Sequence, residues 1–297
     1  MIERNVKATA TDLILLAGIG AAAGWLIYTA TTQADYRWNW QAIPQYLLRF
    51  DPASGRWVPG LILQGVFVTL RLSAWSMVLA VVMGAVMGVF RTSCHPFRRM
   101  LGTGYVELIR NIPVLVWIFI FYYFIGDRLL PAIGIDRIAP MDSGPLNRFL
   151  RTFVAEPSRV PTFVSGVVAL AVYEGAYITE IFRAGIQSID TGQWESSAAL
   201  GFTRLQQLRY IIFPQALRRV MPPLAGQFIS TIKDSAIVSV ISIQELTFQG
   251  MELMAATFLT FEIWLTILAI YFVLCLTCSL LVERFEHFLK REMRRPA

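Results

Sequence analysis

The chain of 297 residues has few charged residues, few cysteines and few histidines. Only 15% of its residues are charged, whereas 56% are hydrophobic. A chain this apolar cannot hide its hydrophobic surface in one water-soluble core, so we expect an integral membrane protein. Three cysteines give no disulfide framework, and the two histidines, His95 and His287, argue against a histidine-based metal site.

Three further absences exclude classes of function. No Gly-x-x-x-x-Gly-Lys-Ser/Thr phosphate loop occurs, so this chain is not expected to handle ATP itself. The formal net charge is +6, but no basic face interleaved with stacking aromatics is present, which argues against nucleic-acid binding. The basic residues instead lie mostly beside apolar spans, where they orient helices and meet anionic lipid in a bilayer. A membrane enzyme would need a catalytic or metal cluster at the interface, and none is found.

Apolar segments predict about six transmembrane helices. These are residues 13–29, 60–90, 105–125, 162–186, 220–243 and 261–282. The first could also be a signal peptide, but it is long for a signal core and follows Asp12, which favours a transmembrane helix. Near the end of the second, Gly84, Ala85 and Gly88 allow close helix packing. Residues 30–59 and 126–161 are predicted as external segments, the latter a loop with one short helix.

The predicted domain organisation follows from these spans. Residues 1–59 form an N-terminal transmembrane helix with an external linker, 60–290 the main transmembrane domain, and 291–297 a tail. With the amino terminus inside, the inner segments hold about fifteen Lys and Arg against about eight outside. The segment 244–260, predicted as an outer turn, has none. Both termini are therefore predicted to be cytoplasmic.

One polar interval, residues 190–214, lies between the fourth and fifth spans on the predicted cytoplasmic side. Asp190 or Thr191 can cap a helix from Gly192 to Leu200, and Gly201 is the residue expected just past its end. Thr203 and Gln206 have capping-box spacing for a second helix, which is predicted to stop near Pro214. Two short helices joined at a glycine cannot span a bilayer. This elbow, residues 190–214, is therefore expected to lie flat or to dock on a partner.

Ionisable residues within the spans form a second set, because such groups near mid-bilayer are costly unless they are paired or face water. Glu174, Lys233 and Asp234 can line a path for a zwitterionic amino acid, or they can pair internally and fix helix register. Arg71, in the outer half of the second span, either snorkels outward or attracts an anionic substrate. Two spacings instead favour structural ion pairs on one helix face. These pairs are Glu107 with Arg110 and Glu180 with Arg183.

A family resemblance begins in the elbow. Glu195-Ser196-Ser197, then Gly201, then Ile211-Ile212-Phe213-Pro214 resemble the EAA loop of ABC importer permeases, which reads Glu-Ala-Ala, a glycine and a later Ile-x-Leu-Pro. Ser196 and Ser197 replace the alanine pair, and Phe213 replaces the usual leucine. Further segments resemble the polar amino-acid permeases of that superfamily. They are 64–73, 105–113, 177–183, 214–219 and 231–235.

The resemblance implies an all-α type I ABC importer permease, with a core of five helices plus an extra N-terminal helix. It implies a multi-pass subunit of the bacterial cytoplasmic (inner) membrane that imports polar amino acids of the histidine, glutamine, glutamate or arginine type. Its implied partners are a second, identical or homologous permease subunit, two ATPase subunits and an external solute-binding protein. ATP and Mg would be bound by the ATPase, and this chain would be a transport subunit without a cofactor or catalytic residues.

The resemblance also assigns roles within the elbow, as a coupling helix seated in a cleft of the ATPase. Glu195 would be the anchor and Gly201 the bend. The remaining coupling residues are Ser196, Ser197, Ala198, Ile211 and Pro214. An ion-gradient-driven amino-acid carrier is the alternative. It would also show buried charges, but more often has two inverted repeats and no capped elbow.

Overall fold

The computed structural model describes residues 10–32, 36–53, 55–126 and 144–293, with three isolated positions between 127 and 143. The chain divides into two compact units, Met1–Gln41 and Ala42–Ala297. The first unit contains α1 (Ala10–Thr32), which covers the predicted first span. α1 is 23 residues long and includes the apolar stretch Leu13–Ala22. The basic start with Arg4 and Lys7, most of the loop 127–143 and the tail end 294–297 lie outside the described residues.

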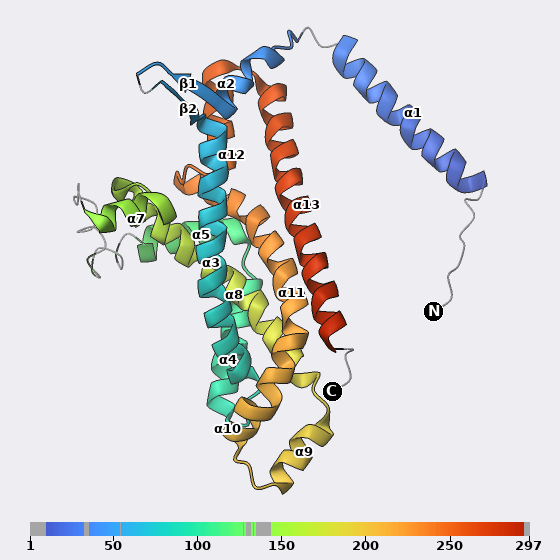
Figure 1. Ribbon diagram of the computed structural model, residues 1–297, viewed down its shortest axis with the longest axis vertical. Coiled ribbons are helices and arrows are strands. Elements are labelled where there is room, and N and C mark those ends of the chain that lie inside the picture. Colours follow the sequence, from blue (N-terminus) through green and yellow to red (C-terminus); the bar gives the residue numbers. More distant parts are fainter. Residues whose placement is uncertain are drawn as a thin grey trace. The chain divides into compact units, whose positions relative to one another are not determined.

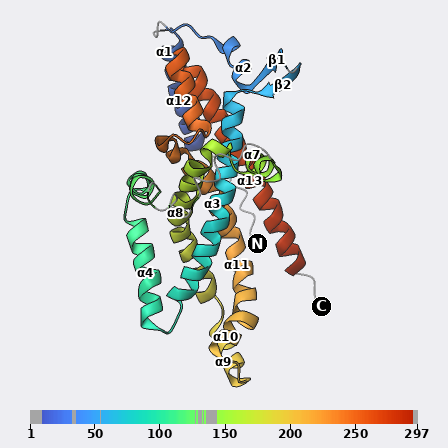
Figure 2. The ribbon, with the colours of Figure 1, turned by 90° about the vertical axis from the view of Figure 1, so that its left-hand side faces the viewer.

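The second unit is built from long helices (Figures 1 and 2). Its helices, with two 3-10 segments and two π-helical ones, are α2 (Pro44–Leu47), α3 (Leu61–Arg91), α4 (Pro96–Arg110), α5 (Val114–Ile120), η2 (Phe121–Gly126), α7 (Pro145–Phe153), η4 (Pro157–Arg159), α8 (Val160–Gln187), α9 (Thr191–Ala199), α10 (Arg204–Gln206), η5 (Gln207–Ile212), α11 (Phe213–Asp234), η6 (Ser235–Ile241), α12 (Leu246–Thr257) and α13 (Thr260–Met293). Four of the described helices are long and apolar enough to cross a membrane, or five if one bent pair counts as a span. The predicted core of five spans corresponds to these.

A small antiparallel hairpin, β1 (Leu48–Asp51) with β2 (Arg56–Pro59), precedes α3. Two aromatic residues help to hold the strands together. Phe50 lies opposite Trp57, with ring centroids 5.8 Å apart, a cross-strand pair that stabilises a hairpin. Figures 1 and 2 show the hairpin and α12 at one end of this unit and α9 and α10 at the other. We call these the hairpin end and the elbow end.

The centre of the unit is the contact between α3 and α8, where small residues permit a close approach. A Cβ added at Gly84 would lie 2.5 Å from Ile178 Cγ2, and one added at Gly88 would lie 2.6 Å from Phe182 Cβ. Neither position has room for a larger side chain. The predicted role of these glycines in close packing is confirmed. On its other side, α8 packs against α11, with Gly185 against Val220.

The predicted third span, residues 105–125, is broken into two helices rather than formed by one. α4 and the helix from Val114 to Phe124 meet at an angle of 108°. Pro113 explains the break, because a proline disfavours helical backbone at the residue before it and supplies no N–H. Asn111 ends α4 by donating from its side-chain amide to the carbonyl oxygen of Glu107 at 2.7 Å.

The predicted end of the second elbow helix at Pro214 is also wrong. Helical structure continues from Arg204 to Ile241, so the elbow runs directly into the fifth span. The six residues before α11 are π-helical, and Pro214 lies in the first turn of α11. A proline is tolerated there because its missing N–H is not required, and π-helical turns are common places for a helix to change direction.

The segment 244–260, predicted as an outer turn, is mainly the helix α12. Its N-cap is Glu245, whose side chain is fully buried. The Glu245 carboxylate accepts from the backbone N–H groups of Thr247 at 2.9 Å and Phe248 at 2.8 Å. It also accepts from the hydroxyls of Tyr271 at 3.0 Å and Thr69 at 3.4 Å. One carboxylate therefore ties α12 to both α13 and α3.

Candidate functional site

The elbow is held in shape by its own caps. Asp190 accepts from the N–H of Gly192 at 2.8 Å, and Thr203 and Gln206 form the predicted capping box. Gly201 has φ +83°, a left-handed conformation that glycine adopts without strain. The three predictions about capping and the bend are confirmed.

The inner face of the elbow packs on the ends of the neighbouring spans. Trp194 and Leu208 lie against a cluster that includes Ile186 of α8 and Ala216 of α11. Arg204 sits over the Trp194 ring, 3.8 Å from its centroid, a cation–π contact within the elbow. The elbow is therefore packed on the end of α8 and continues directly into α11.

The outer face of the elbow is exposed. Glu195, Ser196 and Ala198 are all exposed, and so are two large apolar side chains, Leu200 at 77% and Leu205 at 74%. Ser197 departs from the expected docking surface. It is buried, and its hydroxyl donates to the carbonyl oxygen of Trp194 at 3.0 Å. The side of α9 with Ser197 thus faces inward. The opposite side exposes Glu195 and small residues, and Leu200 is exposed just after the helix.

Glu174 lies in the middle of α8 and is fully buried. Its Oε2 accepts from Nε2 of Gln227 on α11 at 2.5 Å, while its Oε1 has no hydrogen-bond partner. The carboxyl of Asp234, at the end of α11, interacts electrostatically with it. Lys233 is exposed and forms no ion pair in the part of the chain that the structure describes. The structure thus brings together two of the three predicted residues, Glu174 and Asp234, and adds Gln227.

The ion pairs differ partly from the expected ones. Arg183 Nε donates to Glu180 Oε2 at 2.7 Å, as predicted. Glu180 also pairs with Arg91 at the end of α3, which sequence spacing could not indicate because 89 positions separate them. The expected pair of Glu107 and Arg110 is not formed. Glu107 Oε2 accepts from Asn111 at 3.1 Å, and Arg110 lies over the Tyr177 ring.

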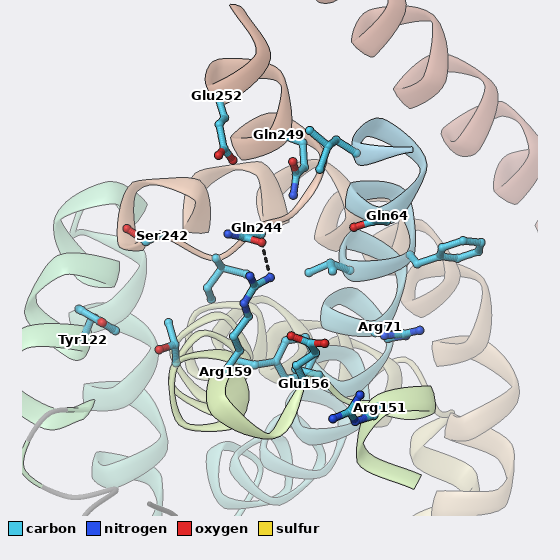
Figure 3. Close-up of a pocket in the computed structure, with 17 residues that line it drawn as sticks. Gln64, Arg71, Tyr122, Arg151, Glu156, Arg159, Ser242, Gln244, Gln249 and Glu252 are labelled. Atoms are coloured by element: carbon cyan, nitrogen blue, oxygen red, sulfur yellow. Dashed lines mark hydrogen bonds between the residues drawn. The ribbon is translucent and has the colours of Figure 1, made fainter. Parts of the chain in front are cut away.

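Arg71 lines a cavity of about 590 Å³ in the half of the unit nearer the hairpin end (Figure 3). The polar residues around it come from four places in the chain, namely α3, the segment 151–162 that includes η4, the 242–244 turn and α12. Tyr122 of η2 also lines it. The sequence prediction identified only Arg71. The others carry no local signal, because they meet only when four separated segments pack together.

Among the described residues, no group of three or more His, Cys, Asp or Glu is placed to hold a metal ion. The features that bear on function are thus a partly exposed elbow, the buried Glu174 with the half-buried Asp234 near it, and a polar cavity. Together with the long apolar helices, they describe a multi-pass membrane protein with an exposed polar elbow at one end.

The comparisons with known proteins agree with this class. Residues 80–295 match the family described as binding-protein-dependent transport system inner membrane component, and the chain belongs to that family. It is 33% identical over 229 residues to the probable glutamine ABC transporter permease protein GlnM of Bacillus subtilis, covering 77% of this chain and 93% of that one. It is 31% identical to the glutamine transport system permease protein GlnP of Escherichia coli (strain K12), covering 87% and 99%.

A solved structure has the same fold. The crystal structure of an amino acid ABC transporter with histidines matches with a TM-score of 0.64 and 31% identity, covering 85% of this chain and 99% of that one. The family consists of transport components, so this chain is a permease and not an enzyme. Membership also favours a binding-protein-dependent permease over the ion-gradient-driven carrier.

Proposed function

We propose that this chain imports polar amino acids as the permease subunit of an ATP-driven importer, and that the exposed face of α9 docks on the ATPase. The structure of the elbow is the main observation that supports this proposal. It presents Glu195, Ser196 and Ala198 together with Leu200, and it is built rigidly onto α8 and α11. A partner that closes around α9 would move these two spans as a body. The relatives' transport of glutamine and the amino acid transporter structure support the substrate class.

The proposed assembly pairs the chain with a second permease subunit, identical or homologous, with two ATPase subunits and with an external solute-binding protein. ATP and Mg bind to the ATPase, and this chain binds no cofactor. In this arrangement the protein lies in the bacterial cytoplasmic membrane. The elbow end and both termini face the cytoplasm.

The polar path through the spans includes Glu174 and Asp234. A buried carboxyl oxygen without a partner is costly, and an ammonium group of a substrate would satisfy it. Gln227 holds the other oxygen and fixes the orientation of the carboxyl. Lys233, exposed beside Asp234, supplies a cation to a passing carboxylate. Glu174 and Asp234 thus face the ammonium of an amino acid, and Lys233 its carboxylate.

Replacement of Gly201 tests the coupling role. Valine at φ +83° is strained by more than the roughly 1–2 kcal/mol of an unbranched residue, although no atom lies within 4 Å of the added Cβ. We expect Gly201→Val to abolish ATP-dependent uptake by the complete importer in proteoliposomes while the protein still inserts into the membrane. Gly104→Val is the matched control, because its Cβ also meets open space. Uptake by this chain alone under an ion gradient would contradict the proposal.

Replacement of Glu174 tests the path. We expect Glu174→Gln and Lys233→Met each to change the rate or selectivity of uptake with assembly intact, because each removes one charge from the path. Glu107→Gln, which neutralises an exposed acid on α4, should leave uptake unchanged. Assembly is measured by co-purification with the ATPase. Loss of assembly in either path variant would favour a purely structural role for these charges.

A further inference from the structure

The cavity near the hairpin end is walled by three helical faces whose polar residues share regular spacing. Gln64 and Arg71 lie two turns apart on α3, Glu156 and Arg159 lie three residues apart at η4, and Gln249 and Glu252 lie three residues apart on α12. Residues at these spacings occupy the same side of a helix. Each face therefore turns its polar side toward one space.

The walls carry opposite charges that do not neutralise one another. Arg71, Arg151 and Arg159 are cations, and Glu156 and Glu252 are acids. Within the described residues, the salt bridges are those of Glu180 with Arg91 and Arg183, so none joins these five groups. Arg159 has five N–H donors, and its hydrogen bond is to the side-chain oxygen of Gln244, as Figure 3 shows. Donors remain for a carboxylate, which guanidinium binds in a bidentate manner.

Gln249 of α12 also lines the cavity. Its side chain is 3% exposed, yet its amide oxygen has no hydrogen-bond partner. In Figure 3 its amide extends from α12 into the space between Gln244 and Gln64. Its position is fixed, because α12 is held by Glu245 and packs so closely on α3 that a Cβ at Gly65 would lie 3.0 Å from Gln249 Cγ. A buried, unsatisfied amide oxygen requires a donor, and the fold supplies none.

We propose that this cavity is a second binding site for the transported amino acid, holding it before it reaches Glu174. Arg159 binds the carboxylate, and the Gln249 amide oxygen with Glu252 receives the ammonium. The volume of about 590 Å³ lies within the range of roughly 300–1,000 Å³ typical of small-molecule sites. From Val160, next to Arg159, to Glu174 the rise along α8 is roughly 21 Å, so the two sites are separate. The proposal rests on the proposed function in its substrate class.

The test begins with the complete importer in proteoliposomes, supplied in turn with each of the twenty radiolabelled amino acids. Absence of ATP-dependent uptake for all twenty contradicts the proposed function itself. The amino acid taken up then serves as the probe. Its equilibrium binding is measured on the permease–ATPase complex in nanodiscs without the binding protein, in a Glu174→Gln background that weakens the inner site.

We expect Arg159→Gln and Gln249→Leu each to weaken this binding about tenfold or more, the effect of losing a charge-assisted or buried hydrogen bond. Arg159→Lys should restore part of it, because the charge remains without the bidentate geometry. Arg148→Gln on α7, an exposed arginine outside the cavity lining, is the matched control. If the Arg159→Gln permease does not assemble with the ATPase, binding of the probe to the Gln249→Leu complex decides whether the cavity is a binding site.

Two results would overturn the inference while leaving the proposed function intact. One is unchanged binding of the probe in both cavity variants. The other is a change only in the concentration of solute-binding protein needed for half-maximal uptake, which would make the cavity a contact for that protein.

Discussion

Two carboxylates cap helices at opposite ends of the second unit, and they differ in nearly everything else. Asp190 caps α9 with one hydrogen bond, to the N–H of a residue two positions along. Glu245 caps α12 from a fully buried position and accepts from groups on α12, α13 and α3. Asp190 thus fixes a local turn on the surface, whereas Glu245 fixes the relative positions of three helices. The elbow can be rigid and still present a free face, while α12 is fixed within the fold.

Removal of the Glu245 carboxylate should have the largest effect on stability. Glu245→Ala leaves buried donors on three helices without an acceptor, each costing about 1–3 kcal/mol, so we expect a loss of about 3 kcal/mol or more. The measurement is thermal or denaturant unfolding of the purified protein in detergent. If Glu245→Ala lowers the free energy of unfolding no more than Asp190→Ala does, Glu245 does not hold the three helices together.

Glu245 should also make the stability of the protein depend on pH. Burial raises the pKa of Glu245, which lies between two spans, from 4.5 to about 7, although hydrogen bonds from the backbone of Thr247 and Phe248 oppose the shift. The folded state therefore holds the proton more tightly than the unfolded state. The contribution of Glu245 to the free energy of unfolding is fully present below about pH 4.5. It is lost as the pH rises to about 7, which lowers the free energy of unfolding by on the order of 3 kcal/mol.

The melting temperature in detergent, followed between pH 4.5 and 8, measures this effect. Glu245→Gln, which cannot ionise, should lose the decline in this range. A decline that persists unchanged in the variant would assign the pH dependence to other groups.

Asp190→Ala should have the smallest effect. Loss of an exposed N-cap costs roughly 1 kcal/mol, and the elbow keeps its contacts with α8 and α11. We expect a small decrease in stability and a larger decrease in ATP-dependent uptake, because α9 would fray at the surface proposed to dock on the ATPase. Asp190→Asn, which retains a capping oxygen, should restore uptake. Unchanged uptake in Asp190→Ala would show that the cap does not serve docking.

The sequence predicted those parts of the fold that depend on near neighbours in the chain. Hydropathy located the second, fourth and sixth spans closely, and the Asp190, Gly201 and Thr203 signals located the elbow, because caps act over two to four residues. The sequence predicted neither the bend at Pro113 nor the continuation of the helix through Pro214, and the two have a shared reason. A proline permits either a break or a helix start, and the packing of the surrounding helices selects between them.

Some residues of the candidate sites could likewise be predicted from the sequence, and others only from the packed structure. The elbow motif, Glu174, Asp234 and the Glu180–Arg183 pair were visible as residue types and spacings. Tertiary packing alone revealed Gln227 as the partner of Glu174 and Arg91 as the partner of Glu180. Tertiary packing also decided the orientation of α9, which turns the Ser197 side chain inward, and sequence spacing did not indicate this.

The sequence by itself determined that this protein lies in a membrane, that it carries a capped elbow and that it resembles a transport permease, because composition, helix punctuation and motif spacing are properties of the chain. Only the tertiary structure decided which polar groups meet. Glu245, Gln249 and Arg159 gain their surroundings from segments far apart in the sequence, and burial and hydrogen-bond satisfaction are properties of packed segments.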